Sequence, residues 1–153
     1  MIDFTYTFLP KVEENEERGI EAMSAKLKIS MTNNGSGPAI LDSFRIFWTP
    51  LGDTSEQRKE VKNWRAFAEE AGNLPYPGAI SIDWDPGNIV RPQTEYVILQ
   101  IPADEELVLA IKEGKNLEIE TRYQSLYEDL FEARLFPSPE QQTSAWKPIR
   151  ASD

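Results

Sequence analysis

Strict alternation of apolar and polar residues marks the region from Met23 to Thr32. The apolar positions are Met23, Ala25, Leu27, Ile29 and Met31, and the residues between them are Ser, Lys and Thr. A period of two is typical of a β-strand with one buried and one solvated face. A polar break at 33–38 follows, and a second apolar run ends in Phe44, Ile46 and Trp48. We expect these two strands to be central, with further strands built onto them.

The same alternation predicts five more strands, separated by turn residues that include several of the eleven prolines and eight glycines. Their inward positions are Ile2, Phe4, Tyr6 and Phe8; Ile80, Ile82 and Trp84; Val97, Leu99 and Ile101; Leu117, Ile119, Thr121 and Tyr123; and Phe131, Ala133 and Leu135. Seven short strands with turn signals every eight to twelve residues or so are typical of a β-sandwich. The pattern therefore predicts a mainly all-β, immunoglobulin-like antiparallel Greek-key sandwich.

Two segments depart from this alternation. Between Ser55 and Ala71 the apolar residues recur every three or four positions, which predicts an inserted amphipathic helix that covers one end of the sandwich. Its candidate N-caps are Asp53, Thr54 and Ser55. A short second helix is expected within 103–114, with a strand at 107–111 as the alternative.

Length and composition indicate one globular domain. The 153 residues are 40% hydrophobic and 27% charged, and a chain of this size buries about 70% of its unfolded surface on folding. We expect the domain to span 1–136. The segment 137–153 is rich in Pro, Ser and Gln, and is predicted to be an extended tail that Trp146 could attach to the domain.

The charge balance narrows the classes of partner. The net charge is −10, from 26 acidic and 16 basic residues, which argues against binding of nucleic acid or anionic lipid. No window approaches the roughly 18 apolar residues of a membrane span, and the N-terminus does not resemble a signal peptide. We expect a soluble chain without direct membrane insertion. Its compartment is not predicted, and it could be part of an anchored envelope protein.

Histidine and cysteine are absent, which excludes Ser-His-Asp and Cys-His catalysis as well as thiolate or imidazole metal sites. The oxygens of 83–88 (D-W-D-P-G-N) resemble a calcium loop, but the segment departs from the EF-hand pattern and suits a turn. Glycosidases need two facing carboxylates, whereas Glu118, Glu120 and Glu132 are expected on solvated faces. We therefore predict no enzymatic activity, no catalytic residues, no cofactor and no metal.

Two short motifs resemble a known family. A strand runs into Asn33-Asn34-Gly35-Ser36-Gly37-Pro38-Ala39, and Val90-Arg91-Pro92-Gln93-Thr94-Glu95-Tyr96 leads into another strand. Together they resemble bacterial immunoglobulin-like accessory domains of the CARDB, or cell-adhesion-related, type. Gln93 stands where that family usually has glycine, and the helix at 55–71 is an insertion. The resemblance spans 22–135 and implies a binding or spacer module.

The prediction that follows is a non-catalytic interaction module that binds a protein partner or forms homo-oligomers. The expected surface is the segment 49–78 together with exposed strand edges. Aromatic residues that the pattern does not assign to the core are the candidate partner-binding residues: Phe47, Trp64, Tyr76 and Trp146. Tyr96 and Ile98, like Phe47, are either covered by the helix or part of an exposed apolar patch. The alternatives are an acidic inhibitor that mimics nucleic acid in a basic groove, and a carbohydrate-binding module.

Overall fold

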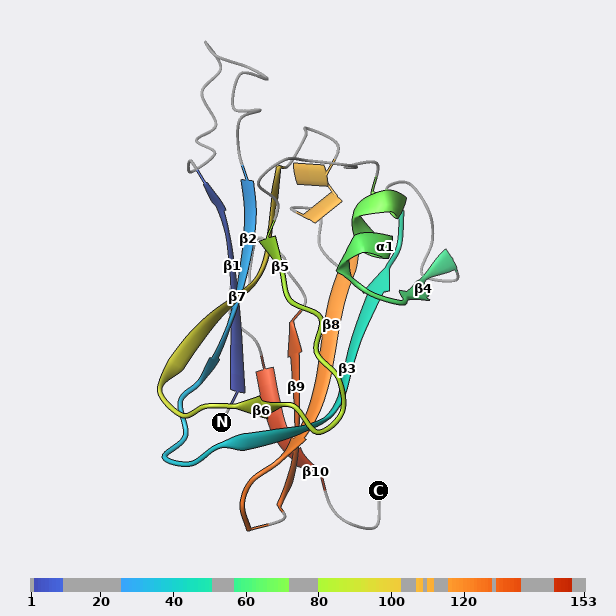
Figure 1. Ribbon diagram of the computed structural model, residues 1–153. Coiled ribbons are helices and arrows are strands. Elements are labelled where there is room, and N and C mark those ends of the chain that lie inside the picture. Colours follow the sequence, from blue (N-terminus) through green and yellow to red (C-terminus); the bar gives the residue numbers. More distant parts are fainter. Residues whose placement is uncertain are drawn as a thin grey trace.

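Two antiparallel β-sheets form the fold (Figure 1). The computed structural model describes residues 2–9, 26–50, 57–71, 80–102, 107–108, 110–111, 116–127, 129–135 and 145–149. The four-stranded sheet has the order β1 (Ile2–Leu9), β2 (Lys26–Asn33), β7 (Thr94–Pro102), β5 (Ile80–Ser81). The six-stranded sheet has the order β10 (Ala145–Ile149), β9 (Leu130–Leu135), β8 (Leu117–Gln124), β3 (Ala39–Trp48), β4 (Lys59–Val61), and β6 (Ile89–Val90) also pairs with β3. The predicted mainly β architecture is confirmed.

The two central strands predicted from the sequence lie in different sheets. β2 pairs with β1 and β7, whereas β3 pairs with β8, β4 and β6. The polar segment 34–38 therefore carries the chain from one sheet to the other. The inward side chains of β2 are fully buried, as the alternation predicts: Leu27, Ile29 and Met31.

A β-bulge changes which side chains of β7 face the core. Ile29 pairs with Leu99 but Ser30 pairs with Val97, so Ile98 is an extra residue on β7. Tyr96 consequently lies opposite the buried Met31, and Ile98 is buried as well. Val97, which was expected on the inner face, lies opposite Ser30 instead. Ile98 thus lies in the core, and Tyr96 is partly buried with its ring 5.2 Å from that of Trp84. The alternative of an exposed apolar patch at these two positions is wrong.

The inserted helix is shorter than predicted. Residues 59–61 form β4, because Val61 pairs with Ile46 and is buried. The helix α1 spans Trp64–Glu70 and packs against β3 and β4. Its N-cap is Asn63, whose Oδ1 accepts a hydrogen bond from the Ala66 amide at 2.8 Å. The candidate caps at 53–55 lie outside the described residues.

Two other predicted segments can be compared with the structure. Leu107, Val108, Ala110 and Ile111 are helical, so the short second helix is confirmed over these residues and the alternative strand is wrong. In the segment predicted as a tail, residues 145–149 form β10 and pair with β9. Within the described ranges, no helix has the length and apolar character needed to cross a bilayer.

Candidate functional site

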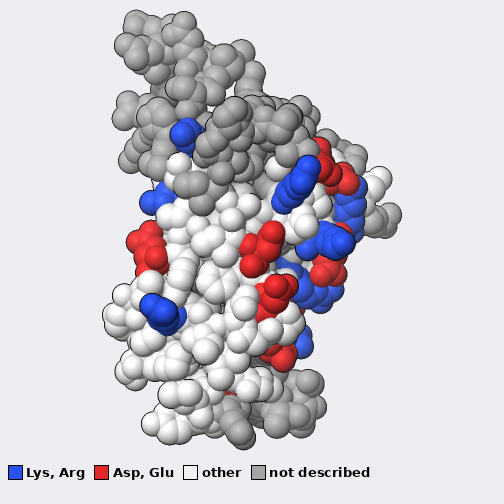
Figure 2. All heavy atoms as spheres, viewed as in Figure 1, with Lys and Arg blue, Asp and Glu red and all other residues white. Residues whose placement is uncertain are grey.

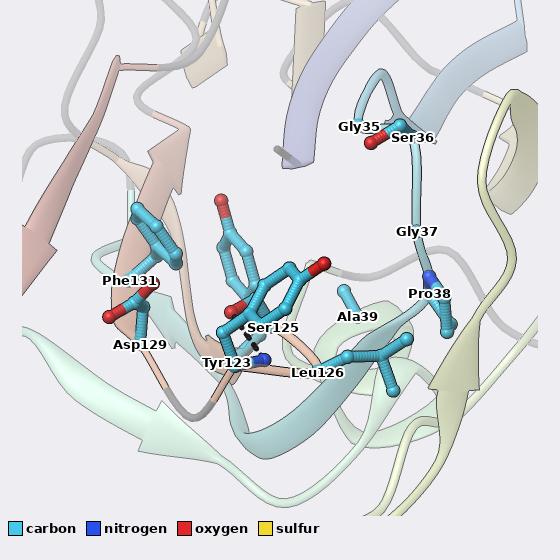
Figure 3. A pocket seen from close by; sticks show the side chains of 11 residues that line it. Gly35, Ser36, Gly37, Pro38, Ala39, Tyr123, Ser125, Leu126, Asp129 and Phe131 are labelled. Atoms are coloured by element: carbon cyan, nitrogen blue, oxygen red, sulfur yellow. Dashed lines mark hydrogen bonds between the residues drawn. The ribbon is translucent and has the colours of Figure 1, made fainter.

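A hollow opens at the end of the sandwich where the chain passes from β2 to β3. It has a volume of about 430 Å³ and is lined by the segment 35–39 and by residues of the β8–β9 hairpin: Tyr123, Ser125, Leu126, Tyr127, Asp129 and Phe131. Figure 3 shows Phe131 and Asp129 on one side of the hollow and Gly35, Ser36 and Pro38 on the other. Two segments about ninety residues apart in the sequence thus form its walls.

The wall at 35–38 is held in place by Asn33, the last residue of β2, which is fully buried. Its Oδ1 accepts a hydrogen bond from the Gly35 amide at 2.9 Å, and its Nδ2 donates to the carbonyl oxygens of Gly37 and Val90, both at 3.0 Å. A buried amide that satisfies three backbone groups fixes the conformation of the turn.

A second side chain connects this turn to the segment before β7. Gln93 Nε2 donates to the carbonyl oxygens of Asn34 and Gly35, each at 3.0 Å. The backbone of Gln93 has φ of 55°, in the left-handed region that glycine adopts most easily. The position where the resemblance leads one to expect glycine is therefore left-handed here, and the glutamine side chain offsets part of that cost through its two hydrogen bonds.

The opposite wall is a hairpin that exposes two large apolar side chains. The amide of Ser125 donates to the Asp129 carbonyl at 3.0 Å, and the amide of Tyr127 donates to Ser125 Oγ at 3.2 Å. At the tip, Leu126 is 62% exposed and Tyr127 is 87% exposed. Ile89 is the third large apolar residue with this degree of exposure in the part of the chain described. The hairpin therefore presents apolar surface to solvent.

Tyr123 also lines the hollow, and it connects the two sheets. Its ring stacks on Phe131 with the centroids 5.4 Å apart, and its hydroxyl oxygen accepts a hydrogen bond from the Ile2 amide at 3.0 Å. This bond reaches β1, 121 positions away in the sequence, and so ties the six-stranded sheet to the four-stranded one. Burial raises the pKa of Tyr123, an effect that the hydrogen bond from Ile2 partly opposes.

We expect Tyr123→Phe to change the alkaline limb of the stability profile. At neutral pH the free energy of unfolding of the variant should be about 1–2 kcal/mol lower than that of wild type, because the Ile2 amide loses its hydrogen-bond acceptor. Above about pH 10 an unfolded tyrosine ionises while the folded one stays protonated, so the wild-type protein loses stability as pH rises and the variant lacks this loss. The difference in urea stability between the two proteins should therefore narrow above pH 10. Tyr127→Phe, at an exposed position, is the control and should follow the wild-type dependence of stability on pH. If the difference in unfolding free energy between wild type and Tyr123→Phe stays constant from about pH 8 to about pH 11, the raised pKa of Tyr123 is contradicted.

Several polar side chains considered as candidate nucleophiles or metal ligands accept hydrogen bonds from backbone amides. The hydroxyl of Ser125 is engaged by the Tyr127 amide, and the chain holds no histidine or cysteine that could activate it. Among the described residues, no group of three His, Cys, Asp or Glu side chains is arranged to hold a metal ion. In the segment considered for calcium, Asp83 accepts from the Trp64 amide and Asn88 accepts from the Asp85 amide.

The expectation that Glu118, Glu120 and Glu132 are solvated is wrong. They lie on the outer face of the six-stranded sheet but are buried at 6%, 6% and 4% exposure. Cross-strand register places arginines opposite two of them, Arg134 opposite Glu120 and Arg122 opposite Glu132. We call the paired side chains of this region the charge ladder; its described members are Arg45, Arg58, Arg122 and Arg134 with Glu60, Glu118, Glu120 and Glu132.

The charge ladder is balanced in sign. Glu118 pairs with Arg58, and Arg45 forms two hydrogen bonds with Glu60 at 2.9 and 3.1 Å, which lower the pKa of Glu60. Figure 2 shows charged side chains of both signs gathered over β4 and α1. Because Glu118 and Glu120 are neutralised by arginines, they do not form the free acidic surface that a nucleic-acid mimic needs. Glu13, Glu14, Glu16 and Glu17, the other half of that expected cluster, lie outside the described residues.

Of the four predicted partner-binding residues, the structure describes the side chains of Phe47 and Trp64, and both are buried. Trp64 is 1% exposed and packs in the core against Phe44 and Phe67. Phe47 is 7% exposed and is covered by the guanidinium groups of Arg58 and Arg45, at 3.8 and 4.8 Å from the ring centroid. Tyr76 lies outside the described residues, and the side chain of Trp146, in β10, is not described.

The residues that do line the hollow were missed as a site. The segment 125–129 falls between two predicted strands, and the alternation of apolar and polar residues assigns no further role to it. The feature of the sequence that could have indicated a binding site is the pair Leu126-Tyr127. Two consecutive large apolar residues in a turn that faces solvent do not favour solubility, and they can mark a binding surface. The other wall was recognised as a turn, but the sequence does not show which hairpin it faces.

Comparisons with protein-family models, with curated proteins and with solved structures returned no match for this chain.

Proposed function

We propose that this chain is a non-catalytic interaction module that binds a protein partner through the hollow and the hairpin tip beside it. The observation that carries the proposal is the exposure of Leu126 and Tyr127 at the rim of a hollow with rigid walls. Apolar side chains grouped at an exposed loop tip mark protein-binding surfaces, and tyrosine is among the residues that contribute most to such interfaces. Loops positioned by a rigid sandwich are also the usual place for binding residues.

The other predicted surface receives less support. The described residues of the segment 49–78 present charged side chains that are paired with each other, as in Lys59–Glu70 and Arg65–Glu69, while Trp64 and Phe67 face the core. Figure 2 shows the contrast, because charged side chains gather over this region and are sparse toward the end of the molecule that carries the hollow. An immunoglobulin-like Greek-key arrangement is part of this proposal, and the two antiparallel sheets are compatible with it. The accessory role of CARDB-type domains enters the proposal only through the resemblance of the sequence motifs.

The test is affinity capture with matched variants. Wild-type chain, the double variant Leu126→Ser/Tyr127→Ser and the control Arg65→Ala are used as baits in a lysate of the source cells, with quantitative mass spectrometry. We expect one captured protein to be enriched equally by wild type and by Arg65→Ala. The double variant should retain at least about tenfold less of this protein, because a tyrosine at the centre of an interface commonly contributes more than a factor of about ten in affinity.

A second copy of the chain is an allowed partner, and light scattering over a dilution series detects it. In that case the double variant should be monomeric at concentrations where wild type is a dimer. Retention of every captured protein, and of any oligomer, by the double variant would contradict the proposal.

A further inference from the structure

We propose that the hollow binds the alkylammonium end of a lysine side chain, methylated or not, that the protein partner presents. This inference rests on the proposed function and specifies its chemistry. Its first support is the lining, which includes three aromatic side chains: Tyr123, Tyr127 and Phe131. The faces of aromatic rings attract cations within about 6 Å of the ring centroid, and groups of such rings are the known means of recognising alkylammonium ions.

The second support is a carboxylate in the same wall. Figure 3 places the Asp129 side chain beside Phe131 at the hollow. None of the ion pairs found among the described residues involves Asp129. The described residues that line the hollow include no lysine or arginine. A cation that enters it thus meets rings and one negative charge, and none of the described lining residues opposes it with a positive charge.

The size and the overall charge agree with this ligand. A volume of about 430 Å³ is at the small end of ligand sites and suits one long side chain. The net charge of −10 attracts a basic partner at long range. The exposed apolar surface of Leu126 next to the hollow can contact the aliphatic part of the same lysine.

The test uses three small probes on the full isotope-labelled chain, followed by NMR titration. The probes are Nα-acetyl-lysine amide, its trimethyl form and Nα-acetyl-norleucine amide, which has the aliphatic chain without the ammonium group. We expect both cations to shift the amide signals of 35–39 and 123–131 and to bind at least about tenfold more tightly than norleucine, because each ring contact contributes a factor of about two to five. The trimethyl form should bind at least as well as lysine, since its charge is less strongly hydrated.

Variants locate the effect. Tyr127→Leu removes a ring but keeps an apolar side chain, Asp129→Asn removes the charge, and each should weaken the binding of the cations by a factor of about two to five with no effect on norleucine. Glu95→Gln removes an exposed carboxylate from the other sheet and should change nothing. Equal binding of norleucine and the cations, or shifts of the amide signals confined to other regions, would overturn the inference.

The outcome is separable from that of the proposed function. If the partner is lost with Leu126→Ser/Tyr127→Ser while the cations bind no better than norleucine, the interaction surface stands and the lysine specificity is refuted. If the cations bind as expected while partner capture ignores the double variant, the ligand site stands and the proposed function is refuted.

Discussion

Trp64→Ala is expected to lower the free energy of unfolding by about 3–5 kcal/mol, the largest effect of any single change considered for this protein. Trp64 is 1% exposed, and its ring contacts Phe44 at 6.2 Å and Phe67 at 5.8 Å between centroids. Phe67 in turn contacts Trp48 on β3 at 5.2 Å. The alanine would leave a cavity between α1 and the six-stranded sheet, at the contact that attaches the helix to the core.

The measurement is chemical denaturation followed by far-ultraviolet circular dichroism. Arg65→Ala is the matched control, because the neighbouring residue has a side chain that is 82% exposed and should change stability by no more than about 0.5 kcal/mol. Trp64→Phe should lie between the two, since the indole Nε1 makes no hydrogen bond within the part of the chain described and only volume is lost. A Trp64→Ala protein as stable as Arg65→Ala would show that α1 does not pack on the core as described.

Asn33→Ala is expected to cost about 3 kcal/mol, although it removes only a small polar side chain. The change leaves the Gly35 amide and the carbonyl oxygens of Gly37 and Val90 without their side-chain partner. A buried group that loses its hydrogen bond costs about 1–3 kcal/mol, and three groups are affected to different degrees because the turn can relax toward solvent. The segment 35–38, which forms one wall of the hollow, should lose its fixed conformation at the same time.

Asn34→Ala is the control for this effect, because Asn34 is adjacent in sequence but exposed. Among the described residues, the only group to which its side chain donates is the Asp3 carboxylate, so the expected cost is below about 1 kcal/mol. Denaturation gives the stabilities, and amide exchange at 35–38 reports the turn. If Asn33→Ala and Asn34→Ala have the same stability and the same exchange rates, the buried amide does not organise the wall.

The local alternation of apolar and polar residues was sufficient to predict most of the strands. Particular residues show which features of the fold it could not predict. Leu27, Ile29 and Met31 are buried as the period of two predicts, because alternation depends only on the geometry of one strand. Val61 fitted a helical stripe equally well, and only its pairing with Ile46 decides that it belongs to a strand. Ile98 is buried through a bulge that depends on the register with β2, which no single segment encodes.

The candidate site was less predictable than the fold, for a related reason. The polar break at 33–38 and the connection at 125–129 both lie between predicted strands, but their position around a common hollow depends on which strands pair. The carboxylates of Glu118, Glu120 and Glu132 show the same limit. Alternation correctly places them on the outer face, whereas their burial depends on arginines supplied by neighbouring strands and by the segment before β4.

The sequence by itself determined a mainly β chain with one polar and one apolar side on most strands, without histidine or cysteine chemistry. These properties follow from residue type and local spacing alone. The tertiary structure decided that β2 and β3 separate into two sheets, that Asn33 ties the turn between them to the segment carrying Val90, and that Tyr127, Asp129 and Phe131 line a common hollow. Such contacts join residues far apart in the chain, and they arise only when the whole set of strands has paired and closed around the core.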